Sequence, residues 1–540
     1  VTEAAPAPHA GSRRLLRSSA VVGVGTALSR LTGFGRVAAI AYALGASTIA
    51  GVYSYANETP NIFYELLLGG ILTATLLPLF VRNLHDGDDE ATNAIVTVAT
   101  VALLVISALG ILLAPLIVRI YTLNVDGPNQ DAQRQLATDW LRCFMPQIFF
   151  YGLTALATGM LNARRRFAAA AFAPVLNNVV VIAMFLSLPR LVSGPITVDR
   201  VLHDPQLILY IGLGTTAGIA AMALALWPAL RHAGVRLRPV FAWRHTAVNT
   251  MIRLSGWTVG YVIVNQIALW VVLVLANGKS AGAFVYLSAY AFFQLPHGLF
   301  AVSITTAIQP DLASSYVANN WTGFRYRFAR GLRLIFTLMV PATALYLGLA
   351  QPVVAALLQR GAFNATATAR VSDTLTAFAV GLPAFSVYLY SLRAFYSMQD
   401  TRTPFLINGL ENALNIVGAL LLYPAMGIPG LALAFSLAYT IAAVVTLVVM
   451  SRRLGSLRGR QIGSTFARVC VVGAAMFAVA WFVSHALGYG SPSAAILAAL
   501  VGAVASVAVG IIGLRVLRVR ELTELRDAFR PATREVAVSE

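Results

Sequence analysis

Charged side chains are scarce in this sequence. Of its 540 residues, 11% are Asp, Glu, Lys or Arg and 58% are hydrophobic, and the mean hydropathy is +0.75. A soluble domain usually carries about 25% charged residues. The composition therefore excludes an ordinary soluble protein and indicates a polytopic membrane protein.

Cysteine and lysine are nearly absent as well. Because both cysteines, Cys143 and Cys470, fall within apolar runs, no disulfide framework or CxxC metal motif is possible. Lys279 is the single lysine among 39 basic residues. No Ser–His–Asp set, HExxH motif, nucleotide-binding loop or zinc-ligand spacing is present. The sequence thus predicts a protein that is not an enzyme and has no metal or cofactor. Any transport must be driven by an ion gradient, the membrane potential or the substrate's own gradient.

Long apolar runs fill the chain instead. A helix needs about 20 apolar residues to cross a bilayer, and fourteen such spans are expected here. Their approximate limits are 18–44, 50–82, 93–118, 136–162, 168–189, 206–231, 247–277, 281–316, 329–358, 371–399, 404–424, 429–451, 465–487 and 492–517. We expect an all-α polytopic membrane fold with two six-helix lobes, at 18–231 and 247–451, and two extra C-terminal helices at 465–517. Tails are expected at 1–17 and 518–540.

Arginine-rich loops predict the orientation, because short cytoplasmic loops carry an excess of Lys and Arg. Basic segments precede spans 1 and 9 and follow spans 4, 6, 12 and 14. They fall on one side of the membrane if the number of spans is even, and the opposite loops are nearly neutral. Both termini are therefore predicted to be cytoplasmic. These loops also account for the formal charge of +18, so no nucleic-acid partner is expected.

The second and eighth spans share a polar interruption. Each contains one proline in a polar-interrupted stretch, Pro60 or Pro296, and another near its end, Pro78 or Pro310. Interrupted helices at corresponding positions of two halves are typical of a transporter site between repeats. Since each lobe begins in the cytoplasm, the two lobes are expected to be parallel repeats.

The most polar stretch inside an apolar run lies at residues 57–70. Its residues Glu58, Asn61 and Glu65 are spaced i, i+3, i+7 and therefore share one face of a helix. Ionised side chains are expensive in hydrocarbon, so they should face protein or water. We expect this segment and the preceding span to line a polar cavity in a membrane transporter.

Two arginines, Arg30 and Arg36, lie in the preceding span. A guanidinium is permanently charged and forms bidentate hydrogen bonds with phosphate oxygens. The pair therefore indicates an anionic substrate group, either phosphate or diphosphate. The alternative is that the arginines only pair with Glu58 and Glu65, or reach the cytoplasmic face. Both roles combine if the carboxylates neutralise the arginines in the empty site and release them to the anion.

Further polar residues lie in later spans. Four residues of span 11 form a stripe on one helical face: Asn408, Glu411, Asn412 and Asn415. Glu411, with Asn415, is a candidate for coupling transport to a proton or cation, and a structural network between helices is the alternative. The pair Asn177–Asn178 either lines the cavity or bonds between helices, and packing is the expectation for each.

Several short motifs follow one another along the chain. They are Ser29-Arg30-x-x-Gly33-x-x-Arg36, Pro60-Asn61, Arg166-Phe167 through Phe172-Ala173-Pro174-x-x-Asn177, Pro296-x-Gly298, Gly361-x-Phe363 and Phe395-Tyr396-Ser397-x-Gln399-Asp400-x-x-Thr403-Pro404. Together they resemble the MurJ/MviN family of lipid II flippases, within the multidrug/oligosaccharidyl-lipid/polysaccharide exporter superfamily. The resemblance covers roughly residues 18–520.

The resemblance implies a V-shaped bundle of two six-helix lobes, with the last two helices forming a groove for a lipid tail. The substrate would be an undecaprenyl-diphosphate-linked muropeptide, lipid II, flipped outward across the bacterial cytoplasmic membrane by alternating access. The family's cationic cavity matches Arg30 and Arg36, with Ser29 and Asn61 beside them. A monomer is expected, with membrane lipids and cell-wall synthesis proteins as candidate partners.

Four positions depart from the family pattern. Two further family arginines align with Tyr64 and Ala291, a glutamate aligns with Gln294, and an aspartate aligns with Gly51. This chain therefore keeps only part of the expected anion clamp. Glu58, Glu65 and Gln294 complete the set of candidate substrate-binding residues. A relative that flips another polyprenyl-diphosphate-linked glycan is one alternative. A multidrug or cation antiporter is another, although an arginine-lined cavity repels organic cations.

Overall fold

The computed structural model describes residues 9–65, 76–125 and 130–521. Within these ranges the regular structure is entirely helical, with no strand. Helix contacts divide the chain into two compact units, Val1–Leu287 with Arg360–Asn364, and Ser288–Gln359 with Ala365–Glu540. The chain is an all-α polytopic membrane protein, as its composition predicts.

The expected spans correspond to the observed helices in order. Among the described residues, 10 helices are long and apolar enough to cross a membrane. There are 11 if α15 (Ala365–Val380) and α16 (Leu382–Ser397), which meet at a bend of 49°, form one span. The three remaining expected spans, the first, second and seventh, fall on stretches that are described only in part.

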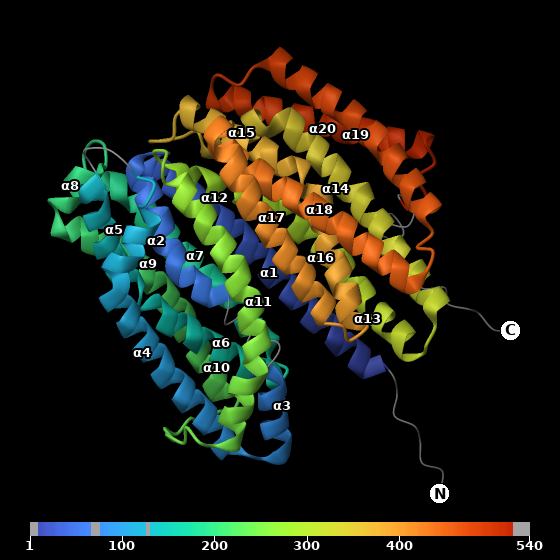
Figure 1. The fold of residues 1–540 in the computed structure, drawn as a ribbon. Helices are drawn as coiled ribbons and strands as arrows, with labels where there is room; N and C mark the ends of the chain where they lie inside the picture. The colour runs from blue at the N-terminus through green and yellow to red at the C-terminus, as the bar shows by residue number, and fades with distance from the viewer. Residues whose placement is uncertain (1–8, 66–75, 126–129, 522–540) are drawn as a thin grey trace, which may run out of the picture. The chain divides into compact units, whose positions relative to one another are not determined.

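Unit 1 contains the first eleven helices and the start of the twelfth (Figure 1). They are α1 (His9–Leu44), α2 (Thr48–Tyr64), α3 (Leu77–Asp86), α4 (Asp89–Tyr121), α5 (Gln130–Phe144), α6 (Gln147–Ala163), α7 (Phe167–Leu191), α8 (Val198–Leu202), α9 (Pro205–Leu224), α10 (Leu226–His232), α11 (Thr246–Ala276) and α12 (Gly282–Pro296). Helix α1 packs along α7, and α2 packs against α5 and α6. Helix α11, which the sequence assigns to the second lobe, packs on α4 in this unit. The predicted lobe boundaries stay a prediction.

Small and aromatic residues together position α1 and α2. A Cβ atom at Gly25 of α1 would lie 2.8 Å from Cβ of Ala171 on α7, so only glycine permits this close approach. Small residues are favoured at such membrane helix contacts because they let the backbones meet. On α2, the buried ring of Tyr53 meets Phe144 and Phe185 edge-on, at centroid distances of 5.7 and 5.1 Å.

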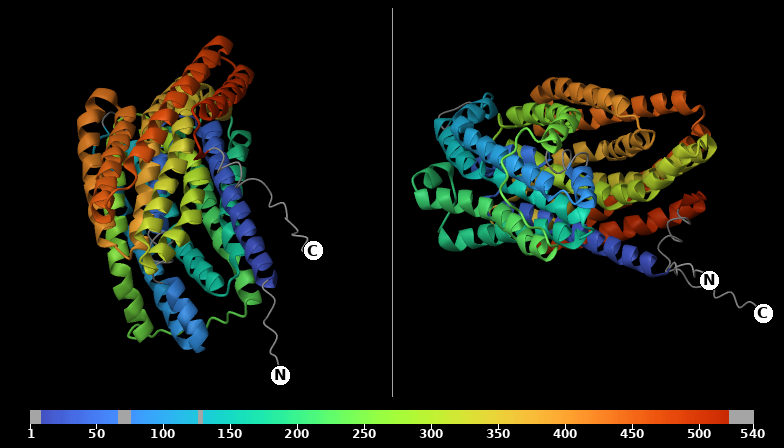
Figure 2. Two further views of the ribbon diagram at one scale, coloured as in Figure 1. Left: turned by 90° about the vertical axis from the view of Figure 1, so that its right-hand side faces the viewer. Right: turned by 90° about the horizontal axis from the view of Figure 1, so that it is seen from below.

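Unit 2 continues from the end of α12 through eight further helices and a short π-helical segment. They are η2 (His297–Ala301), α13 (Val302–Val317), α14 (Trp321–Leu358), α15, α16, α17 (Arg402–Met426), α18 (Ile428–Leu454), α19 (Gly459–Leu487) and α20 (Pro492–Val516). Helices α19 and α20 pair with each other and lie along α14 (Figures 1 and 2). The π-helical segment follows Pro296 directly, which accounts for the interruption predicted in span 8.

Similar turns lie at corresponding places of the predicted internal repeat. After α6, the amide of Arg166 donates to the carbonyl of Leu161 at 2.9 Å; after α16, the amide of Asp400 donates to the carbonyl of Phe395 at 3.0 Å. The residue before each, Arg165 or Gln399, is left-handed with φ of 57° or 59°. These are the bonds and dihedral angles of a Schellman helix end.

The turns that precede α4 and α14 are matched in the same way. The amides of Asp88 and Asn320 each donate to the carbonyl five residues earlier at 2.8 Å. Their side chains then cap the following helix, Asp88 by accepting from Ala91 N and Asn320 by accepting from Gly323 N, each at 2.8 Å. Two connections in each unit thus share the same main-chain hydrogen-bond pattern.

The turn between α16 and α17 also carries charge. Asp400 accepts hydrogen bonds from the Thr403 amide at 3.0 Å and hydroxyl at 2.6 Å, and from Arg453 on α18. Burial opposes ionisation, but these bonds outweigh it and hold the pKa of Asp400 below its ordinary value. These bonds tie the charged turn to α18.

Candidate functional site

Helices α1 and α2 of unit 1 carry the predicted substrate residues. Ser29, Arg30 and Arg36 lie on α1 and are each half-buried, as are Glu58 and Asn61 on α2. Glu65 follows α2 directly and is exposed. The side chain of Tyr64 and the rest of the polar stretch, residues 66–70, lie outside the described residues.

Electrostatics links the two helices. Burial has the largest effect on the Glu58 carboxyl, Glu65 adds a like charge to it, and Arg36 adds the weakest influence, a positive charge. No ion pair within 4.0 Å joins Arg36 to Glu58, both of which are described. The arginine is therefore near its counter-charge without being locked to it, so it remains available to another anion.

Arg30 has an unsatisfied donor. Its Nε is buried and makes no hydrogen bond within the described residues. Such a group costs about 1–3 kcal/mol or more when it stays unpaired. On the neighbouring α7, Asn178 donates to the Ser29 carbonyl at 3.1 Å and to Thr32 Oγ1 at 3.0 Å, which fixes the turn of α1 that carries Arg30. The packing role predicted for Asn178 is thereby confirmed.

Two residues of α6 hold the polar face of α2 through hydrogen bonds to it. Tyr151 donates its hydroxyl to Asn61 Oδ1 at 2.7 Å, and Asn61 Nδ2 donates to Glu58 Oε2 at 3.3 Å. One turn earlier, the fully buried Gln147 donates to Asn57 Oδ1 at 3.5 Å. Because Tyr151 occupies the amide oxygen of Asn61, the amide nitrogen must face Glu58.

Sequence reasoning missed Gln147 and Tyr151. Each is a single polar group inside an apolar run, and nothing in one sequence pairs it with α2. The available signal was their i, i+4 spacing, which matches that of Asn57 and Asn61.

Replacing Tyr151 with phenylalanine is expected to lower transport activity several-fold while leaving folding intact. The change removes only the hydroxyl, which frees the Asn61 amide to turn and leaves Glu58 less constrained beside Arg36. The measurement is transport by the reconstituted variant, compared with Tyr210→Phe, which removes a hydroxyl bonded to Ser187 away from these residues. Equal activity of both variants would show that Tyr151 only packs.

The remaining predicted site residues belong to unit 2. Gln294 on α12 donates its amide to the Tyr290 hydroxyl. On α17, Glu411 is 1% exposed, and neither its Oε2 nor Asn415 Oδ1 has a hydrogen-bond partner in the described chain. A buried carboxyl with an unsatisfied oxygen is stabilised by a proton or a bound cation.

A transition-metal site is not formed by these side chains. Within the described ranges, no group of three or more His, Cys, Asp or Glu residues could hold a metal ion. The arrangement on α1 and α2 offers guanidinium donors, an adjustable counter-charge and amides, so it suits binding of an anion.

Comparison with known proteins decides the family. The family model described as "Lipid II flippase MurJ" matches residues 40–502. The chain belongs to the MurJ family. A probable lipid II flippase MurJ of Rhizobium tropici is 29% identical over 476 residues, covering 87% of each chain. That of Haemophilus influenzae is 28% identical over 474 residues, covering 85% of this chain and 90% of the relative.

Solved structures agree on the fold of this MurJ family member. A lipid II flippase MurJ in an inward closed conformation matches with a TM-score of 0.75 at 20% identity, covering 92% of this chain and 99% of the other. An inward-facing multidrug resistance MATE transporter matches with a TM-score of 0.64 at 13% identity, covering 80% and 99%. The helical arrangement is therefore similar to that of these two transporters.

Proposed function

We propose that this chain flips lipid II outward across the bacterial cytoplasmic membrane by alternating access. Membership of the MurJ family supports the substrate. The observation that carries the mechanism is the pair of intramembrane arginines on α1, one of which has a buried and unpartnered Nε. The diphosphate engages Arg30 and Arg36, and Ser29 and Asn61 contribute polar contacts beside them.

The carboxylates serve as exchangeable counter-charges in this proposal. Glu58 neutralises Arg36 while the site is empty, and the arriving diphosphate displaces it. This agrees with the electrostatic influence of Arg36 on Glu58, which is exerted without a close ion pair. Glu65, exposed at the end of α2, adds repulsion that helps to release the anion.

Glu58→Gln is expected to slow release and lower the turnover of flipping several-fold, because the arginines then hold the anion without a competitor. Glu65→Gln should act in the same direction but less strongly, since its side chain is exposed. Binding of a diphosphate lipid and its flipping rate are measured in proteoliposomes. The exposed Glu90→Gln is the control, and unchanged turnover in Glu58→Gln would show that the carboxylates only pack.

Other parts of the chain take supporting roles. Glu411 and Asn415 couple flipping to a proton or cation, which satisfies their unpaired oxygens. Helices α19 and α20 receive the lipid tail along surfaces that expose Phe482, Leu500 and Val504. Both termini face the cytoplasm, and the protein acts as a monomer without catalysing a chemical step.

Depletion of the protein tests the function. Lipid II is expected to accumulate on the inner leaflet, and wall synthesis is expected to stop. Reconstituted flipping of a lipid II headgroup probe then separates wild type from Arg30→Ala. Continued growth with normal lipid II turnover would contradict the proposal.

A related substrate is the second candidate. Tyr64, Ala291 and Gln294 stand where the resemblance leads us to expect two arginines and a glutamate. A weaker clamp would suit another polyprenyl-diphosphate-linked glycan. Flipping of such lipids in parallel with lipid II distinguishes the two, and a drug-efflux assay tests cation antiport.

A further inference from the structure

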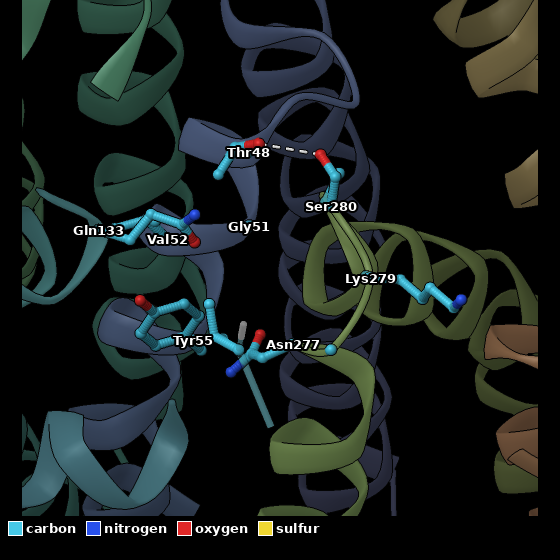
Figure 3. A pocket seen from close by; sticks show the side chains of 12 residues that line it. Thr48, Gly51, Val52, Tyr55, Gln133, Asn277, Lys279 and Ser280 are labelled. Atoms are coloured by element: carbon cyan, nitrogen blue, oxygen red, sulfur yellow. Dashed lines mark hydrogen bonds between the residues drawn. The ribbon is translucent and has the colours of Figure 1, made fainter. Parts of the chain in front are cut away.

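A small cavity lies within unit 1, away from Arg30 and Arg36. It has a volume of about 140 Å³ and is bounded by α2, α5 and the turn between α11 and α12 (Figure 3). A hydrogen bond of 2.9 Å between the hydroxyls of Thr48 and Ser280 closes one side. Gly51 of α2 is also in the wall, next to Ala281.

Polar groups without protein partners converge on this cavity. The Gln133 amide makes no hydrogen bond within the described chain and extends toward the cavity from α5 (Figure 3). Asn277 donates its Nδ2 to the Tyr121 carbonyl at 2.9 Å, so its Oδ1 remains as a free acceptor. Tyr55 lines the cavity as well, but its hydroxyl is sealed from it by the surrounding atoms.

The remaining lining restricts the charge and shape of an occupant. Val52, Val125 and Ala281 supply an apolar wall. No acidic side chain is among the described lining residues, and the ammonium of Lys279 points away from the cavity (Figure 3). A neutral group suits this lining, because no charged side chain of the described residues points into it. A cavity of roughly 150 Å³ accommodates a benzene molecule, so the occupant is a group of at most about six heavy atoms.

We propose that this cavity binds a secondary amide of the form CH₃–CO–NH–, such as an acetamido group. The carbonyl accepts from Gln133 Nε2, and the N–H donates to Asn277 Oδ1. The methyl group packs on the apolar wall. An amide satisfies the donor and the acceptor at once, whereas a carboxylate would repel the Asn277 oxygen and an alkyl group would leave all of these groups unpaired.

The location gives the site a role in export, and this step rests on the proposed function. By the predicted orientation, the α1–α2 and α11–α12 turns lie on the extracytoplasmic side, where a flipped headgroup emerges. The amide then belongs to an N-acetylated sugar or to a peptide carried by the lipid. The site would hold that headgroup briefly on the release side.

Direct binding to the full-length protein in nanodiscs tests the site. The probes are methyl N-acetyl-β-glucosaminide, methyl β-glucoside, which lacks the acetamido group, and N-acetylalanine methylamide as the peptide source. Dissociation constants come from ligand-observed NMR. The acetamido glycoside is expected to bind about tenfold more tightly than the plain glucoside, which corresponds to one or two hydrogen bonds. Tighter binding of the peptide probe assigns the amide to the peptide.

Variants localise the effect. Gln133→Leu is expected to reduce the acetamido preference to near unity. Gln206→Leu, which removes an exposed amide at the start of α9, should keep it. Equal binding of all probes, or a preference that survives Gln133→Leu, would overturn the proposal. Flipping is not part of this measurement, so a protein that flips lipid II without amide preference refutes only this site. A protein that prefers amides without flipping refutes only the proposed function.

Discussion

Arg30→Ala and Arg36→Ala are each expected to abolish growth of cells that depend on this chain. Each variant removes a guanidinium that we propose contacts the diphosphate, and Arg36→Ala also leaves Glu58 without its proposed counter-charge. Losing one partner of a buried charged contact costs about 2–5 kcal/mol, which corresponds to at least about a 30-fold loss of affinity. The measurements are complementation after depletion and flipping of a lipid II probe by the purified variant.

Two comparisons make this result specific. Arg36→Lys keeps the charge but cannot form the bidentate contact, so it should retain partial activity. Arg82→Ala removes an exposed arginine of the same unit, whose ion pair with Asp86 at 3.6 Å lies at the surface. Such surface pairs contribute little, so this variant should behave as wild type. Full complementation by Arg30→Ala would show that the α1 arginines do not clamp the substrate.

Arg333→Met is expected to cause the largest loss of stability. Arg333 on α14 pairs through Nε with Glu521, which follows α20, and the two side chains are only 10% and 5% exposed. Removing one partner of a buried ion pair leaves an uncompensated charge and costs about 3–5 kcal/mol. The expected result is a marked fall in the thermal unfolding midpoint of the purified protein in detergent.

A double variant separates the pair from simple packing. In Arg333→Met/Glu521→Leu both charges are gone, and most of the lost stability should return, because apolar pairs often replace buried ion pairs without penalty. Arg82→Ala again serves as the exposed control. An unchanged midpoint in Arg333→Met would mean that the contact does not tie the end of α20 to α14.

The spans could be predicted because a bilayer imposes a length on every helix that crosses it. Their interruptions were harder to place. Pro296 marks the break in span 8. The π-helical form of His297–Ala301, however, depends on tertiary contacts that the local sequence does not identify. The Schellman ends after α6 and α16 place Arg165 and Gln399 in the left-handed region, where a sequence reader expects glycine.

At the candidate site, the spacing of Glu58 and Asn61 predicts their contact, and they are hydrogen-bonded at 3.3 Å. The same spacing places Glu65 on that face, but it is exposed where Glu58 is half-buried. Tyr151 could not be assigned from the sequence because its partner lies on another helix. Contacts within a helix follow from periodicity, whereas contacts between helices require the packed structure.

The matched turns after α6 and α16 have an evolutionary consequence. Both are closed by main-chain atoms, so their shape does not depend on the side chain that follows the left-handed residue. One copy carries Arg166 there, and the other carries Asp400 in a bond with Arg453. Under the predicted repeat, opposite charges could therefore accumulate at equivalent corners without breaking either connection, and each half could acquire its own electrostatic surface along the same chain path.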